Sequence, residues 1–207
     1  MKSSTIRLKL FTLLIALSLS LAFTGLTSAS EFSADIVMSG GPMSGQGKVW
    51  VKGQKMRQDF TAGGAKMIMI MDLGKGYSWM LMPKNKTYIK NKVESKGKGF
   101  RPENFTGMQQ GEMKAQVKKA GTEKINGYTC DKYVITYKNK KMGSMTQWFA
   151  PKLGYPIKMI AKNKMMGQMV TELKNIKTGG VDDGLFEIPA GYKPMQMPKM
   201  PQMPKGK

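Results

Sequence analysis

Residues 47–91 read GKVWVKGQKMRQDFTAGGAKMIMIMDLGKGYSWMLMPKNKTYIKN, and this stretch decides the fold. Short apolar runs alternate in it with turn residues, which is typical of antiparallel strands joined by tight turns. The run 66–71 is apolar at every position from Met67 onward, which predicts a strand covered on both faces or in the middle of a sheet. The stretch therefore predicts a meander of four or five strands with an apolar face that needs a cover. The expected strands are 47–51, 55–60, 66–71, 77–82 and 87–89.

The first thirty residues are a targeting segment and stand apart from the fold. Three basic residues precede an apolar run over 10–23, and small residues follow at 27–30. This order is typical of a secretory signal peptide that is cleaved near Ala29 or Ser30, with an uncleaved membrane anchor as the alternative. No cysteine follows the apolar run, so we expect no lipid anchor. The mature chain is expected in the periplasm.

The sequence of the second half of the chain predicts one helix and further strands. The segment 102–120 is the one plausible helix, because its large apolar residues fall roughly on one side. We expect it to lie across the sheet, either as a lid or as part of the core. The lid residues would be Phe105, Met108, Met113 and Val117.

A strong hairpin signal, Asn126-Gly127, marks the return to strands. The total of about nine to eleven short strands predicts a mainly β fold, a sandwich or a barrel. The further strands are expected over 32–37, 122–125, 128–137, 144–149, 157–161 and 168–176.

Charge limits the partners of the mature chain. The full sequence has 34 Lys and Arg against 13 Asp and Glu, a formal net charge of +21, and loss of the three basic residues of the targeting segment leaves +18. The only arginines left are Arg57 and Arg101, and lysine is a hydrated point charge that is poorly suited to reading base edges. The composition therefore favours an anionic membrane surface over nucleic acid, with a simply solvated face as the alternative.

The sequence offers no catalytic constellation. It has no His and shows no Gly-rich phosphate loop and no nucleophile elbow. The single cysteine, Cys130, is expected to be a small buried residue without a disulfide partner. Asp182 and Asp183 are adjacent and would point to opposite faces of a strand, so loop chemistry before Gly184 explains them better. We predict a protein that is not an enzyme and has no cofactor.

Three passages carry a resemblance to a known family. They are GQGKVWVK at 45–52, the 72–88 passage with its Trp and Pro, and the ending at 172–192 with VDDGLFEIPAGY. These passages resemble the LolA/LolB-like periplasmic lipoprotein carriers, and most closely the DUF4412 branch of exported LolA-like proteins, over most of residues 32–193. The resemblance implies an incomplete antiparallel barrel with helix over its apolar concave face, which holds acyl chains in the carriers.

Two departures from the carriers limit what the resemblance implies. The carriers begin with a long amphipathic helix, whereas residues 32–37 read as a strand here. They also have a lid-latching Arg just after the Trp-Val-Lys motif, where this chain has Gly53. The resemblance therefore implies an apolar, lipid-sized cavity more directly than it implies lipoprotein trafficking.

Methionine is unusually frequent, with 21 residues. Within the predicted sheet it is interpreted as adaptable core or cavity lining, since an unbranched thioether conforms to irregular partners. These residues are Met67, Met69, Met71, Met80 and Met82. The ending 194–207 is rich in Met, Pro and Lys and is expected to be a disordered tail. Thioethers suit copper(I), so an alternative function is copper(I) handling in the envelope by Met195, Met197, Met200 and Met203.

The leading hypothesis is an exported, monomeric carrier made of a signal peptide (1–30), a LolA-like β domain (31–193) and the tail (194–207). It would shelter an apolar, acyl-chain-bearing ligand, a lipid or a lipoprotein, in a curved antiparallel sheet that forms a half-open barrel. The candidate cavity residues are Trp50, Phe60, Met69, Trp79, Met82, Tyr88 and Trp148. Side chains alternate along a strand, so only some of these can face one cavity. A third possibility is a structural domain whose concave face is packed by its own side chains.

Overall fold

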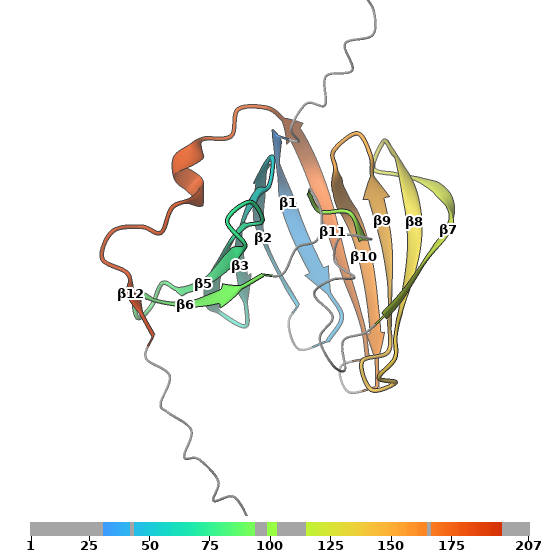
Figure 1. The fold of residues 1–207 in the computed structure, drawn as a ribbon, viewed down its shortest axis with the longest axis horizontal. Coiled ribbons are helices and arrows are strands. Elements are labelled where there is room, and N and C mark those ends of the chain that lie inside the picture. Colours follow the sequence, from blue (N-terminus) through green and yellow to red (C-terminus); the bar gives the residue numbers. More distant parts are fainter. Residues whose placement is uncertain (1–30, 42–43, 94–98, 103–114, 165–166, 196–207) are drawn as a thin grey trace, which may run out of the picture.

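A single curved sheet makes up the fold (Figure 1). The computed structural model describes residues 31–41, 44–93, 99–102, 115–164 and 167–195. The strands follow the order β12-β6-β5-β4-β3-β2-β1-β11-β10-β9-β8-β7, and the sheet does not close, because β12 and β7 stand at its two edges. The predicted mainly β, half-open barrel is confirmed.

All neighbouring strands are antiparallel except β12, which pairs with β6 in parallel. This two-residue strand raises the number of strands above the predicted range. The strands are β1 (Glu31–Ser39), β2 (Gly45–Lys52), β3 (Lys55–Ala62), β4 (Ala65–Asp72), β5 (Tyr77–Met82), β6 (Thr87–Lys92), β7 (Ala115–Ile125), β8 (Tyr128–Tyr137), β9 (Ser144–Ala150), β10 (Tyr155–Asn163), β11 (Gly167–Thr178) and β12 (Lys193–Pro194).

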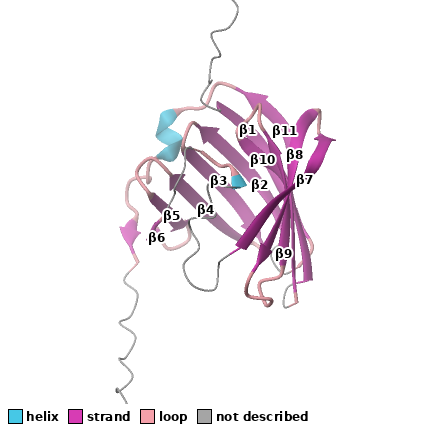
Figure 2. Cartoon of the chain, turned by 45° about the vertical axis from the view of Figure 1, so that its right-hand side comes forward, coloured by secondary structure: helices cyan, strands magenta, loops and turns pink. Residues whose placement is uncertain are grey.

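The two faces of the sheet are distinguished by an aromatic cluster. The ring of Phe100 lies 5.0 Å from the ring of Tyr155, and the Tyr155 ring lies 5.6 Å from that of Phe32, both edge-on. We call the face that bears Phe32 and Tyr155 the inner face, and the opposite one the outer face. Figure 2 shows residues 99–102 between the two halves of the curved sheet, on the inner side.

The inner face is tightly packed at the centre of the sheet. Phe32, Val51 and Met56 lie side by side on β1, β2 and β3, and they are 0%, 0% and 5% exposed. From the other half of the sheet Ile157 and Leu173 join the same cluster, also almost fully buried. This cluster is the main hydrophobic core, and it ties β1–β3 to β10 and β11.

A C-terminal strap, residues 181–195, covers the outer face of β3–β6 (Figure 1). It contains the 3-10 helix η3 (Asp183–Phe186) and ends as β12. Phe186, Ile188 and Tyr192 of the strap pack against a second hydrophobic cluster on β4 and β5. The members of this second cluster are Ile68, Ile70 and Leu81, which are 5%, 0% and 0% exposed.

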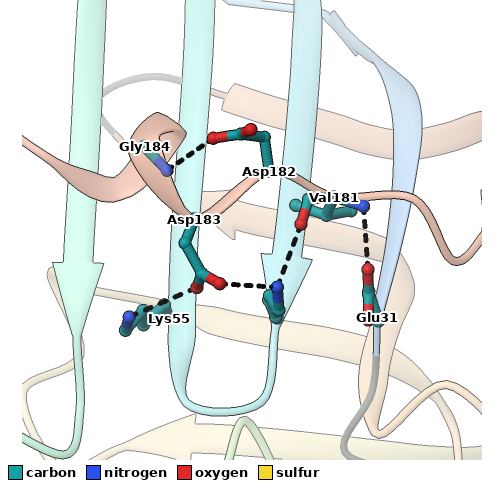
Figure 3. Close-up of polar contacts among 7 residues, drawn as sticks. Glu31, Lys55, Val181, Asp182, Asp183 and Gly184 are labelled. Atoms are coloured by element: carbon teal, nitrogen blue, oxygen red, sulfur yellow. Dashed lines mark hydrogen bonds and ion pairs between the residues drawn. The ribbon is translucent and has the colours of Figure 1, made fainter.

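Polar contacts hold the start of the strap against β1–β3 (Figure 3). The backbone N–H of Val181 donates to Glu31 Oε1 at 2.8 Å. Lys52 Nζ donates to Asp183 Oδ2 at 2.8 Å, and Lys55 Nζ lies 3.6 Å from the other oxygen of that carboxylate. The strap is therefore fixed by charge at its start and by apolar contact further along.

Strand β4 lies within the sheet, between β3 and β5, and has apolar residues on both faces, in line with its continuous apolar run. Ile68 and Ile70 point to the outer face beneath the strap and are buried. Met67, Met69 and Met71 point to the inner face and pack, partly buried, against the main core. The alternation of Ile and Met along this strand therefore separates two different surfaces.

The predicted helix over 102–120 is wrong where the structure describes that segment. Residues 115–120 belong to β7, and Val117 pairs with Ile135 of β8. Ala, Gln and Lys favour a helix in isolation, but pairing with β8 overrides that local preference. The predicted lid residues Phe105, Met108 and Met113 lie outside the described residues. Within the described ranges, no helix has the length and apolarity needed to cross a membrane.

Candidate functional site

The inner face of β4–β6 is lined by methionine. Met69 pairs with Met80 of β5, and Met80 pairs in turn with Ile89 of β6, so these side chains share one side of the sheet. Residues two positions apart on each strand share that side as well. We call this surface the methionine face; it consists of Met67, Met69, Met71, Met80, Met82 and Ile89.

On the inner face, the exposure of the apolar side chains increases from the centre of the sheet toward β6. Phe32 and Val51 are fully buried, and the three methionines of β4 are half-buried against the core. Met80, Met82 and Ile89 are half-buried too, but they belong to neither hydrophobic cluster of the described residues. The methionine face is thus an apolar surface that the described residues cover incompletely.

A small hollow of about 40 Å³ lies between the two halves of the sheet, lined among others by Gln58, Met159 and Thr171. That is close to the share of liquid volume taken by one water molecule, about 30 Å³. This hollow is too small for an acyl chain, whereas the methionine face nearer the β6 edge is an apolar surface of larger extent.

The structure divides the predicted cavity residues between the two faces. Phe60 and Met69 lie on the inner face, and Met82 extends the same side of β5. Trp79 and Tyr88 pack with the second cluster on the outer face. Trp50 is on the outer face too, opposite Arg57, whose guanidinium carbon lies 5.9 Å from its ring. Trp79 sits one position out of phase with Met80, and Tyr88 one position out of phase with Ile89. The composition of a strand does not reveal that phase.

Trp148 is a buried member of the main hydrophobic core and also makes polar contacts on β7–β10. Its indole Nε1 donates to Glu123 Oε2 at 2.7 Å, and Nζ of Lys132 and Lys158 lie 5.2 and 5.4 Å from its rings. Hydrogen bonds from Lys132 and Trp148 lower the pKa of Glu123 from its ordinary value. Trp148 is 6% exposed, so this group holds β7 to β8 and β9 and is not part of the methionine face.

A larger hollow, about 840 Å³ and open to solvent, lies on the outer side of β1–β3. Its lining includes charges of both signs, from Asp35, Lys48 and Lys174. Asn175 donates to Asp35 at 2.7 Å. These charges distinguish the hollow from the methionine face, which carries none.

The titratable groups form structural contacts. Asp182 Oδ1 accepts the backbone N–H of Gly184 at 2.6 Å, which is the loop role expected from the sequence. Burial raises the pKa of the Cys130 thiol, and this cysteine is fully buried. Among the described residues, no group of three or more His, Cys, Asp or Glu side chains is arranged to hold a metal ion.

Of the candidate copper(I) ligands, only Met195 is described. It is 37% exposed, and its backbone N–H donates to the carbonyl of Tyr88 at 2.7 Å. Met197, Met200 and Met203 lie outside the described residues.

The comparison with known families covers almost the whole β domain. A family model described as a domain of unknown function, DUF4412, matches residues 33–154 and 139–192. The chain belongs to the DUF4412 family. The resemblance stated from the sequence is confirmed at that level. No curated protein matches this DUF4412 chain.

Solved structures extend the likeness at the level of fold. An uncharacterized conserved protein from Thermus thermophilus has a TM-score of 0.53 and 8% identity over 81% of this chain and 90% of its own. PNGF-II has a TM-score of 0.52 and 15% identity over 81% of this chain, which spans 31% of PNGF-II. A LolA superfamily protein, NE2245 from Nitrosomonas europaea, has a TM-score of 0.39 and 11% identity over 77% of this chain and 90% of its own.

Proposed function

We propose that this DUF4412 protein is an exported, non-enzymatic binding protein whose ligand is a flexible apolar chain, such as the acyl chain of a lipid or lipoprotein. The observation that carries the proposal is the half-exposed methionine face, which continues the hydrophobic core outward to β6. On the opposite face of the same strands the strap buries Ile68, Ile70 and Leu81, whereas Trp79 and Tyr88 remain partly exposed. Among the described residues, no such strap lies over the methionine face.

The choice of side chain supports a ligand without a fixed shape. Methionine is unbranched, polarizable and free to change rotamer, so it adapts to partners of different outline. The outer face of β4 uses Ile68 and Ile70 against a partner that is part of the chain. β-Branched side chains are stiff and suit such a permanent contact. The face that lacks a permanent partner carries the adaptable residue type.

The amino-terminal segment supports the expected location. Its basic start, short apolar run and small residues are those of a secretory signal, which would deliver the mature chain to the cell envelope. Acyl chains in that compartment need shielding from water, because each exposed methylene costs about 0.8 kcal/mol.

A binding experiment tests the proposal directly. The mature chain, residues 31–207, is titrated into a fluorescent long-chain fatty acid, and Met80→Gln is compared with the wild type. Glutamine has nearly the same size but a polar end that the ligand would desolvate, so affinity should fall about tenfold. Met142→Gln, in the turn between β8 and β9, is the matched control and should bind as the wild type does.

Two outcomes would contradict the proposal. One is a wild-type chain that binds no fatty acid, and the other is an equal loss of affinity in the Met80 and Met142 variants. Native mass spectrometry of the protein purified from its own envelope is the complementary measurement. It should show a bound acyl-bearing molecule that Met80→Gln reduces.

A further inference from the structure

Two neighbouring turns of the sheet repeat the same basic sequence. Of the four Lys-Asn-Lys sequences in the chain, those at 84–86 and 90–92 belong to the β5–β6 hairpin. The other two are at 138–140, in the turn between β8 and β9, and at 162–164, where β10 turns into β11. Both turns lie at the lower end of the sheet in Figure 1. We call the five side chains that they present the lysine end; they are Lys138, Lys140, Lys141, Lys162 and Lys164.

The two turns form one continuous surface. Lys162 pairs with Ser144 in the ladder between β9 and β10. Gly143 has a φ of +72°, and a Cβ atom there would lie 1.9 Å from the carbonyl oxygen of Lys162. Only glycine permits this close approach of the two turns.

The turn between β8 and β9 is ordered by its own hydrogen bonds. The side chain of Asn139 accepts the backbone N–H of Lys141 at 3.0 Å, and the Asn139 carbonyl accepts the N–H of Met142 at 3.0 Å. The backbone that carries the lysines next to Asn139 is therefore already ordered, so binding of a partner costs little additional backbone entropy.

The charge of the lysine end is not balanced locally. All five lysines are exposed, and none forms an ion pair with a carboxylate of the described residues. The flanking sequences 136–146 and 160–170 contain no Asp or Glu. A positive field therefore extends from this end for about one Debye length, roughly 10 Å at moderate salt.

The opposite end of the sheet is different, because acidic residues are interspersed there. Lys52 and Lys55 pair with Asp183, Lys75 lies 3.9 Å from Asp72, and Lys132 lies 2.6 Å from Glu123. Carboxylates thus accompany lysines at that end, whereas none accompanies the lysines of the lysine end among the described residues.

We propose that the lysine end binds the surface of an anionic lipid bilayer. Lysine is a compact, strongly hydrated charge that suits a fluid array of phosphate headgroups, where no fixed bidentate geometry is available. Both arginines of the mature chain, Arg57 and Arg101, lie elsewhere. A polynucleotide partner would call for arginine forks and stacking aromatics among the lysines, and neither occurs in the two Lys-Asn-Lys turns. The proposal is independent of the acyl ligand proposed above.

Vesicle binding of two charge-matched variants tests the proposal. The first carries Lys138→Gln, Lys140→Gln and Lys162→Gln at the lysine end. The control carries Lys124→Gln, Lys152→Gln and Lys177→Gln, which remove the same charge from exposed positions at the opposite end of the sheet. The probe is sedimentation of the mature chain with vesicles of phosphatidylcholine mixed with phosphatidylglycerol, at low salt.

The lysine-end variant should lose about fivefold in binding for each lysine removed, or roughly a hundredfold in total. The control variant should lose much less, and binding of the wild type should weaken as salt is added. Wild-type protein that does not sediment with these vesicles would overturn the proposal. Equal losses in the two variants would do so too, because net charge alone would then explain binding.

A competition arm separates the membrane from soluble polyanions. A single-stranded oligonucleotide is added at the same charge concentration as the vesicles. The vesicles should retain the protein. Transfer of the protein to the oligonucleotide, with the same dependence on the three lysines, would overturn the proposal in favour of a soluble polyanion.

Discussion

The two faces of β4 are built from different side chains and end up in different states. On the outer face, Ile68 and Ile70 are buried beneath the strap and fully packed. On the inner face, Met67, Met69 and Met71 pack against the core but are only half-buried. One strand thus combines a permanent internal contact with a surface that the described residues cover incompletely. The residue type follows that division, since stiff side chains fill the closed face and flexible ones line the open face.

The largest expected effect on stability comes from truncating one side chain on each face of β4 in turn. Ile70→Ala should cost about 2–5 kcal/mol of unfolding free energy, because it leaves a cavity at a fully buried site. Met69→Ala, next to it on the chain but half-exposed, should cost about 1 kcal/mol or less. Urea unfolding of the mature chain measures both values. Similar losses for the two variants would mean that both faces are equally closed.

A smaller effect should follow from releasing the strap. Arg57 forms a two-point contact with Asp59, at 2.6 and 3.1 Å, and Nη1 donates to the carbonyl of Leu185 at 3.0 Å. The Arg57 side chain is 13% exposed, so Arg57→Gln should cost about 1–3 kcal/mol through lost, partly buried hydrogen bonds. Hydrogen exchange should then increase in residues 185–195. An increase confined to other segments would contradict the assigned role of this contact.

A gain in stability is expected at the other end of the strap. The carbonyl of Lys86 accepts the backbone N–H of Lys193 at 2.9 Å, and Lys86 has a φ of +48°. A left-handed conformation costs an ordinary residue about 1 kcal/mol, so Lys86→Gly should raise stability by about that amount and keep the hydrogen bond. Lys84→Gly is the control, since Lys84 lacks a positive φ. A thermal melt should show an increase for Lys86→Gly alone.

The smallest effect is a dependence on pH at the start of the strap. The hydrogen bond from Lys52 holds the pKa of Asp183 below its ordinary value of 3.8. A carboxyl with a lowered pKa in the folded state stabilises the fold above its unfolded pKa, and this contribution is lost as the pH falls through the folded pKa. Wild type should therefore exceed Asp183→Asn in stability at neutral pH, and the difference should vanish near pH 2.

Unfolding curves of both proteins at the two pH values provide the measurement. The Asp183 side chain is 65% exposed, so the difference at neutral pH should be the smallest of the four effects. A difference that persists unchanged in acid would show that Lys52 and Asp183 contribute through contacts other than their charges.

The strands could be predicted from the sequence because their signals are local. Turn residues such as Asn126-Gly127 mark the ends of strands, and the continuous apolar run 66–71 marked a strand inside the sheet with apolar residues on both faces. The predicted helix over 102–120 failed at 115–120 for the converse reason. The residues of β7 favour a helix by local propensity, and only pairing with β8, a contact between separate segments, makes them a strand.

The candidate site could be predicted only in part. Methionine content identified Met69 and Met82, but the face on which each aromatic lies depends on register, and a shift of one residue reverses it. The alternation of Met and Ile over 67–71 already held that information for β4, because it places the two residue types on opposite faces. The strap had no comparable signal, since its apolar residues Phe186 and Ile188 stand among loop residues.

The two edge strands of the sheet affect whether protein molecules can pair with one another at high concentration. An uncovered strand edge is a template on which another chain can add. Here β7 is mostly exposed, carries Lys118, Lys119 and Lys124, and is interrupted by a bulge between Lys119 and Thr122. The opposite border ends in Pro194, which has no N–H to offer. Both edges thus carry features that hinder the addition of another chain.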